Sequence, residues 1–233
     1  MTRLTPHRPL VSAVILLAVV TLTGCAGASR ASQAPAPQPE FQMGLEGAIA
    51  RARADSLRYP YTQADIDFMS GMIHHHAQAI QMSRWASTHG ARADVQLLAE
   101  RIINAQQGEI SLMQAWLQDR RQPVPEPNPM GMTMGHGATA HTMLMPGMLT
   151  AEQMAQLDAA RGEEFDQLFL DFMIQHHRGA VGMVDELFSH RGAGQDESVF
   201  KFASDVQVDQ ATEIRRMLQM LIESPPSSSQ GSR

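Results

Sequence analysis

Histidine doublets framed by methionines occur twice in this chain, 101 residues apart. The copies occupy residues 68–82 and 169–183, and both fit the pattern F-[ML]-x-x-M-I-x-H-H-x-x-A-[IV]-x-M. Imidazole and thioether groups suit copper, and thioether favours Cu(I), whereas calcium and magnesium demand oxygen ligands. Recurrence of the whole pattern indicates a structural unit used twice, with soft-metal ligands at equivalent places.

On a helix, residues three, four and seven apart share a face, so each doublet and its methionines form one stripe. Adjacent histidines point about 100° apart because a helix has ~3.6 residues per turn. One imidazole of each doublet can therefore face a neighbouring helix while the other flanks it. A core stripe with hydrogen-bonded histidines is the alternative. The candidate ligands are Met72, His75, His76 and Met82 in the first copy and Met173, His176, His177 and Met183 in the second.

A second group of soft ligands lies between the copies, within the proline- and glycine-rich segment 122–149. Thioethers cannot be deprotonated, and they keep their affinity in acidic, oxidising surroundings where thiolates are lost. The M-x-M and M-x-x-M spacings resemble the methionine motifs of bacterial copper-handling proteins outside the cytoplasm, with a low-complexity linker as the alternative. The candidate ligands here are Met130, Met132, Met134, His136, His141, Met143 and Met145.

Helices must position these residues. Apolar residues recur at helical spacing over 62–120, which predicts a hairpin of two helices that turns near Gly90. Residues 150–223 repeat the hairpin after a short first helix that ends near Gly162. Two hairpins that each expose an apolar stripe bury it best against one another. We therefore expect an all-α four-helix bundle with pseudo-twofold symmetry over 45–223, its hairpins joined by a disordered linker rich in methionine and proline.

The second helix of each hairpin carries polar residues within an apolar stripe. The motif Q-x-x-E-I-x-x-M occurs in both, at an offset of 104 residues. A buried carboxylate needs a partner, and a glutamate that accepts the second ring N–H of a ligating imidazole fixes its orientation. This supporting role is assigned to Glu109 and Glu213 together with Gln106 and Gln210, and direct ligation by the carboxylates is the lesser alternative.

The N-terminus predicts export. In residues 1–24, basic residues precede an apolar run too short to span a bilayer, as in a signal peptide. The order L-T-G-C resembles the lipobox of bacterial lipoproteins, so Cys25, the only cysteine, is the expected lipid attachment site. The alternative is an ordinary secreted protein whose signal peptide is cleaved near this position. Lipid on Cys25 would anchor the protein at the periplasmic face of the envelope, on the outer membrane of a diderm host.

The flanking segments and the overall charge narrow the possible partners. Residues 25–44 and 224–233 have the composition of a disordered tether and tail. The formal net charge is −6 and the basic residues are scattered, which argues against a nucleic-acid partner.

The two repeated motifs, M-I-x-H-H-x-x-A-[IV]-x-M and Q-x-x-E-I-x-x-M, resemble the bacterial domain-of-unknown-function family 305 over about 62–221, apart from the linker. The resemblance implies a secreted or periplasmic protein with a ferritin-like four-helix arrangement, and copper-binding relatives implicated in copper tolerance. It supports the eight doublet residues as candidate ligands. The first copy has His74 where the second has Gln175, so the two halves need not bind metal equally.

The sequence thus predicts a non-enzymatic copper-binding lipoprotein. It would sequester copper, mainly Cu(I) and also Cu(II), or exchange it with copper-exporting or copper-accepting envelope proteins. One alternative is a structural or partner-binding bundle whose histidines only form hydrogen bonds. A ferritin-like di-metal oxidase is less favoured, because the sequence lacks the Glu-x-x-His motif that such sites use.

Overall fold

The computed structural model describes residues 61–134 and 141–223, together with Gly47 and Ala50. The predicted signal peptide, Cys25, the tether, the tail and His136 lie outside the described residues, as does nearly all of segment 45–58. Within 61–134 and 141–223, no helix is both long and apolar enough to cross a membrane.

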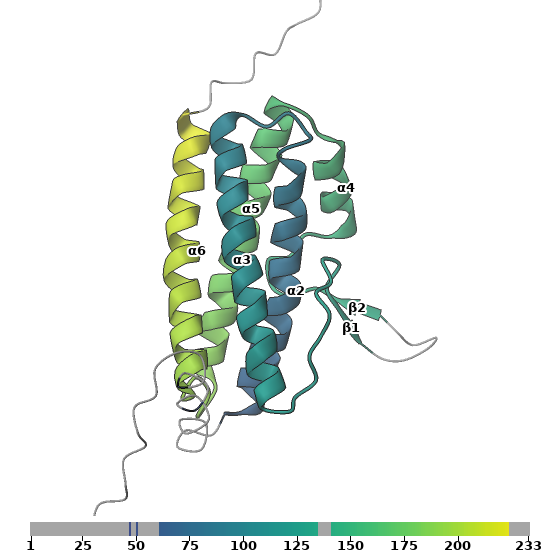
Figure 1. Cartoon of the computed structure of the whole chain (residues 1–233). Coiled ribbons are helices and arrows are strands. Elements are labelled where there is room, and N and C mark those ends of the chain that lie inside the picture. Colours follow the sequence, from purple (N-terminus) through teal and green to yellow (C-terminus); the bar gives the residue numbers. More distant parts are fainter. Residues whose placement is uncertain (1–46, 48–49, 51–60, 135–140, 224–233) are drawn as a thin grey trace, which may run out of the picture. The chain divides into compact units, whose positions relative to one another are not determined.

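Four long helices account for most of the described residues (Figure 1). They are α2 (Gln63–Trp85), α3 (Ala93–Asp119), α5 (Glu163–Ser189) and α6 (Glu197–Glu223), and a short helix, α4 (Ala151–Ala159), precedes α5. Helix α2 packs along α3, and α5 packs along α6, so each half is a helical hairpin. Contacts between α2 and α5 join the halves. The all-α bundle built from two repeated hairpins is therefore confirmed.

Local signals set the helix ends close to where the sequence places them. Thr62 forms a capping box with Asp65 at the start of α2, and Thr150 forms one with Gln153 at the start of α4. Gly162 separates α4 from α5 with a φ of 60°, a left-handed conformation that glycine adopts at little steric cost. These helix boundaries are therefore set by side chains and backbone conformations next to each boundary.

Two equivalent aspartates tie the hairpins to each other. Asp65 and Asp166 lie 101 residues apart in the first turns of α2 and α5, and both are buried. Asp65 Oδ1 accepts the backbone N–H of Gly194 at 2.7 Å, and Asp166 Oδ1 accepts that of Arg92 at 3.2 Å. Each carboxylate thus binds the turn of the opposite hairpin. This role was missed in the sequence, although the shared offset signals it.

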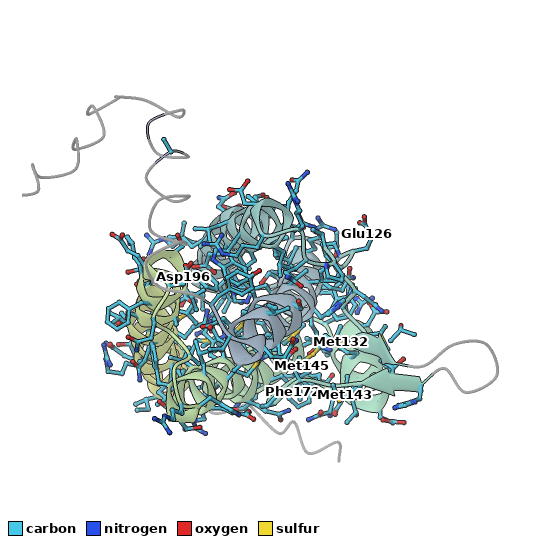
Figure 2. The ribbon with its side chains drawn as sticks, turned by 90° about the horizontal axis from the view of Figure 1, so that it is seen from below. Glu126, Met132, Met143, Met145, Phe172 and Asp196 are labelled. Atoms are coloured by element: carbon cyan, nitrogen blue, oxygen red, sulfur yellow. The ribbon has the colours of Figure 1, made fainter. Side chains whose placement is uncertain are left out.

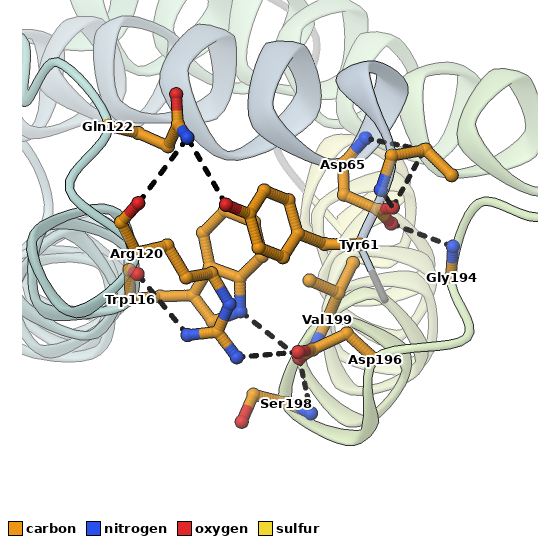
Figure 3. A network of polar contacts seen from close by, with 10 residues as sticks. Tyr61, Asp65, Trp116, Arg120, Gln122, Gly194, Asp196, Ser198 and Val199 are labelled. Carbon is orange, nitrogen blue, oxygen red and sulfur yellow. Dashed lines mark hydrogen bonds and ion pairs between the residues drawn. The ribbon is translucent and has the colours of Figure 1, made fainter. Parts of the chain in front are cut away.

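A buried ion pair fastens the end of α3 to the start of α6 (Figure 3). Arg120 Nη2 lies 2.5 Å from Asp196 Oδ2, and Trp116 Nε1 donates to Asp196 Oδ1 at 3.1 Å. The guanidinium of Arg120 also lies over the Trp116 ring, 4.3 Å from its centroid. Asp196 accepts the backbone N–H groups of Ser198 and Val199 as well, so one carboxylate both caps α6 and pairs with α3.

Two apolar clusters fill the bundle. One contains Met72 with Met183, and the other contains Met82 with Met173. Residues that precede the doublet in one copy therefore pack with residues that follow it in the other. This pairing requires α2 and α5 to run antiparallel about a pseudo-twofold axis that passes between the doublets.

The linker differs from the disordered chain that its composition predicts. Strand β1 (Met132–Met134) pairs antiparallel with β2 (His141–Met143), and Thr133 lies opposite Thr142. Met145, Met148 and Leu149 are buried against the bundle. The expectation of disorder is wrong for this part of the linker, because composition takes no account of the helix surface on which the segment packs. Residues 145–149 cross this surface and are called the strap.

Candidate metal centre

The two doublets meet at the centre of the bundle. The ring centroids of His75 and His176 are 3.8 Å apart, so these two imidazoles touch across the pseudo-twofold axis. His76 and His177 flank them, each with its ring centroid 6.3 Å from that of its doublet neighbour. All four side chains are fully buried. These four residues, called the imidazole layer, bring together what the sequence places 101 residues apart.

Burial keeps the central imidazoles neutral. Desolvation, followed by the nearby His76 and His177, lowers the pKa of His75 to about 3. Desolvation likewise lowers the pKa of His176 well below its ordinary value, with His75 as the next cause. A neutral imidazole keeps a lone pair on one ring nitrogen, and this is the form that ligates metals.

The strap fixes which nitrogen of His75 carries the proton. Nε2 of His75 lies 3.0 Å from the carbonyl oxygen of Pro146, which can only accept a hydrogen bond. Nε2 therefore carries the hydrogen, and the lone pair lies on Nδ1. Nδ1 is buried and meets no hydrogen-bond partner in the described chain. Sequence reasoning did not foresee that a backbone carbonyl of the linker would orient a doublet histidine.

Glutamates on the outer helices reach the flanking imidazoles. Nε2 of His177 donates to Glu213 Oε2 at 2.6 Å. Nε2 of His76 lies 2.7 Å from Glu109 Oε2, although this pair lacks the alignment of a hydrogen bond. The two carboxylate side chains are 22% and 24% exposed, so they stand between the imidazoles and solvent. The two glutamates thus lie where a carboxylate can orient an imidazole ring, and their supporting role at a metal stays a prediction.

Several buried polar atoms of the central residues lack partners among the described residues. They are the Nδ1 atoms of His75, His76, His176 and His177, Nε2 of His176, and the Oε1 atoms of Gln106 and Gln210. Each unpaired buried group costs about 1–3 kcal/mol, and native proteins keep few of them without a role. Gln106 and Gln210 lie on α3 and α6, one turn before Glu109 and Glu213. Nitrogen and oxygen donors of this kind suit copper.

The side chains do not form a finished coordination shell. Across residues 61–134 and 141–223, no group of three or more His, Cys, Asp or Glu side chains is placed to bind one metal ion. Ligation at the imidazole layer would therefore require rings to rotate. His75 and His177 each hold one hydrogen bond through Nε2, while the Nδ1 atoms of all four rings have no described partner to give up.

The methionines are divided between two places. Met72, Met82, Met173 and Met183 are buried in the apolar clusters on either side of the imidazole layer. Of the linker candidates, Met145 is buried and others are exposed. Met130 is 44% exposed, His141 lies on β2 and is exposed, and Met134 belongs to β1. The remaining linker candidates, Met132, Met143 and Met145, line a cavity together with Met183.

Positions at which the two copies differ contact the linker. Nδ1 of His74 accepts the backbone N–H of Asn128 at 3.3 Å. At the equivalent position, Gln175 Nε2 donates to the carbonyl oxygen of Gly147 at 3.3 Å. The extra histidine of the first copy thus binds the linker backbone instead of extending the imidazole layer.

A second pair of differing positions has the same explanation. Gln78 Oε1 accepts the N–H of Leu149 at 2.6 Å, and its Nε2 donates to the carbonyl oxygen of Leu149 at 3.1 Å. The equivalent residue is Gly179, where a Cβ would stand 2.0 Å from the carbonyl oxygen of Pro146. The single linker can cross only one side of a twofold bundle, so it imposes different residues on the two copies.

The fold and the centre define a duplicated helical bundle with a buried histidine cluster between its repeats. Residues 65–221 match the domain of unknown function DUF305, and the chain belongs to this family. A stretch of 63 residues is also 41% identical to an uncharacterised protein of Acanthamoeba polyphaga mimivirus, and this match covers 26% of the chain and 41% of the viral protein.

Solved structures share the fold. A DUF305 fragment from Deinococcus radiodurans is 29% identical with a TM-score of 0.58, and the match covers 71% of this chain and 99% of that one. A DUF305 protein from Streptomyces coelicolor, described as secreted, is 29% identical with a TM-score of 0.56 over 69% and 91% of the two chains. CopM in its Cu(II)-bound form is 31% identical with a TM-score of 0.51 over 68% and 95%. CopM has also been solved in a Cu(I)-bound form.

Proposed function

We propose that this protein binds copper outside the cytoplasm, and that it sequesters or delivers the metal without catalysing a reaction. One observation carries the proposal: both repeats contribute imidazoles to a single buried layer, in which most ring nitrogens lack a described partner. The similarity to CopM, whose structures contain Cu(II) or Cu(I), supports copper as the metal.

The positions of the donor atoms suggest how the centre binds copper. Nδ1 of His75 and the nitrogens of His176 are the first candidates, because they are central and unpaired. His76 and His177 join them, oriented by their glutamates. Imidazole accepts either oxidation state of copper, while thioether favours Cu(I). We propose Cu(I) as the main cargo because buried methionines flank the layer on both sides.

The site of action belongs to the same proposal. The L-T-G-C sequence supports lipid attachment at Cys25 and retention at the envelope. The similar protein described as secreted supports a location beyond the cytoplasm. Copper held there could contribute to copper tolerance through exchange with exporting or accepting proteins.

The test is copper binding by the exported protein, measured for Cu(I) by competition with a chromogenic chelator and for Cu(II) by electron paramagnetic resonance. Replacing His75, His76, His176 and His177 by glutamine should weaken binding by about 100-fold or more, since even outer-shell changes cost 10–100-fold. His89→Gln, at the turn after α2, is the matched control and should bind normally. A folded fourfold variant with wild-type copper stoichiometry and affinity would refute the proposal.

A structural bundle without metal is the second candidate. The observation in its favour is that His76 and His177 each meet a glutamate while the described side chains form no ready set of three acidic, histidine or cysteine ligands. Thermal unfolding separates the two functions. A ligand at 100 times its Kd stabilises the folded state by about 2.7 kcal/mol, so copper should raise Tm only if the folded protein binds it.

A further inference from the structure

A cavity of about 730 Å³ lies between the linker hairpin and the helices α2 and α5. Four thioethers line it: Met132 from β1, Met143 from β2, Met145 from the strap and Met183 from α5. Figure 2 shows Met132, Met143 and Met145 close together on this side of the bundle. The cavity therefore gathers methionines from segments that are separate in the sequence.

We infer that this cavity is a second metal site, specific for a soft monovalent cation such as Cu(I) or Ag(I). The inference rests on the proposed copper function and adds a separate place where the monovalent ion binds. Thioethers are neutral, soft donors that bind Cu(I) and Ag(I) well and hard divalent cations poorly. Four of them around one cavity make a donor set unlike that of the imidazole layer.

The inner part of the site is already formed. Met145 and Met183 are only 9% and 7% exposed, so their sulfurs are held in place by packing. Both approach Gly71 of α2: a Cβ there would lie 3.0 Å from Sδ of Met145 and 3.5 Å from Cε of Met183. At the equivalent position of the second copy the residue is Phe172. The glycine of the first copy thus leaves room beside the two thioethers.

The outer part can close over an ion. Met132 is half-buried and Met143 is 43% exposed, and unbranched methionine side chains adapt to irregular spaces. The exposed carboxylates of Asp67 and Glu186 also line the cavity. Their negative charge attracts a cation to the mouth and offsets the single positive charge, while the interior offers it sulfur.

The cavity and the imidazole layer are separate but connected. Met183 follows His177 by six residues, which places it about 9 Å farther along α5. Met145 lines the cavity, and the carbonyl oxygen of the next residue, Pro146, accepts the hydrogen bond from His75. An ion bound to Met145 would therefore lie one residue from the contact that orients the central imidazole.

The test uses Ag(I) alone as the probe and the full exported protein. The variant replaces Met132, Met143 and Met145 by leucine, a volume-conserving change that packed cores tolerate. The matched control replaces Met154, Met217 and Met220 by leucine, and none of these residues lines the cavity. Native mass spectrometry should show that the variant loses the Ag(I) bound in the cavity and the control keeps it. Affinity for this ion should fall by about tenfold or more in the variant.

A second measurement needs no substitution. With methionine methyl groups labelled by ¹³C, Ag(I) should shift the signals of Met132, Met143, Met145 and Met183, and leave those of Met154 and Met220 in place. Shifts confined to other methionines, or wild-type silver binding by the leucine variant, would overturn the inference. Normal Cu(II) binding by that variant would show that the imidazole layer binds copper independently of the cavity. If the histidine variants bind copper normally while silver still binds in the cavity, the proposed role of the imidazole layer is wrong and the cavity site remains.

Discussion

The contact between α5 and the strap is so close that one methyl group should break it. Gly179 lies in the interior of α5, and a Cβ there would stand 2.0 Å from the carbonyl oxygen of Pro146 and 2.6 Å from Cα of Gly147. Both neighbours are backbone atoms, so they cannot rotate away as a side chain would. Gly179→Ala must therefore push the strap off α5 and separate Pro146 from His75.

Three effects determine how much Gly179→Ala changes the free energy of unfolding. Overpacking a close contact costs about 1–3 kcal/mol, and the lost hydrogen bond to His75 costs about 0.5–1.5 kcal/mol. Alanine in turn stabilises the helix by about 1 kcal/mol because its helix propensity is higher than that of glycine. The free energy of unfolding should therefore fall by about 0.5–3.5 kcal/mol.

Gly182→Ala supplies the control in the same helix. A Cβ at Gly182 would meet no described atom within 4 Å apart from the adjoining backbone of α5, so only helix propensity changes, and stability should rise by about 1 kcal/mol. Urea unfolding followed by circular dichroism measures both variants. The reasoning is wrong if Gly179→Ala unfolds at the same urea concentration as Gly182→Ala, or at a higher one.

Two further predictions concern pH and the hairpin contacts. The pKa of His75 falls from 6.5 to about 3 on folding, so between these values the unfolded chain binds a proton that the folded protein excludes. The copper-free protein should thus lose stability as the pH drops below about 6.5, by up to ~1.4 kcal/mol per pH unit from this residue, and His75→Asn should flatten the slope in thermal unfolding. Asp65→Ala and Asp166→Ala should each destabilise by about 1–3 kcal/mol because a backbone N–H in the turn of the opposite hairpin loses its acceptor, and the larger loss is expected for Asp65, whose contact is fully buried. Urea midpoints equal to the wild type in either variant would contradict the bridging role.

The parts of the fold that the sequence predicts correctly depend on local signals. Thr62, Gly162 and the repeated doublets act through the residues next to them, so helix ends and hairpins follow from short stretches of sequence. The meeting of the doublets follows in turn, because two copies of one hairpin pack about a twofold axis. Local chemistry and symmetry together therefore lead to the imidazole layer.

The features that the sequence does not predict depend on segments far apart in the chain. The order of the linker comes from its contacts with Gln78 and with the helix surface around Gly179. Its composition alone indicates disorder. Similarly, Met183 belongs to the doublet motif by sequence but lies with the linker methionines in space. Glycine has a low helix propensity, so Gly179 inside α5 was the available signal that another backbone segment packs closely against this helix.

The position of the imidazole layer on the twofold axis has a consequence for how the centre depends on protein concentration. One hairpin carries only half of the imidazoles, and its apolar stripe has no partner. If the hairpins were separate polypeptides, the layer would exist only in their dimer and would be lost on dilution. Joining both hairpins in one chain makes the centre unimolecular, so it forms equally well in a single isolated molecule.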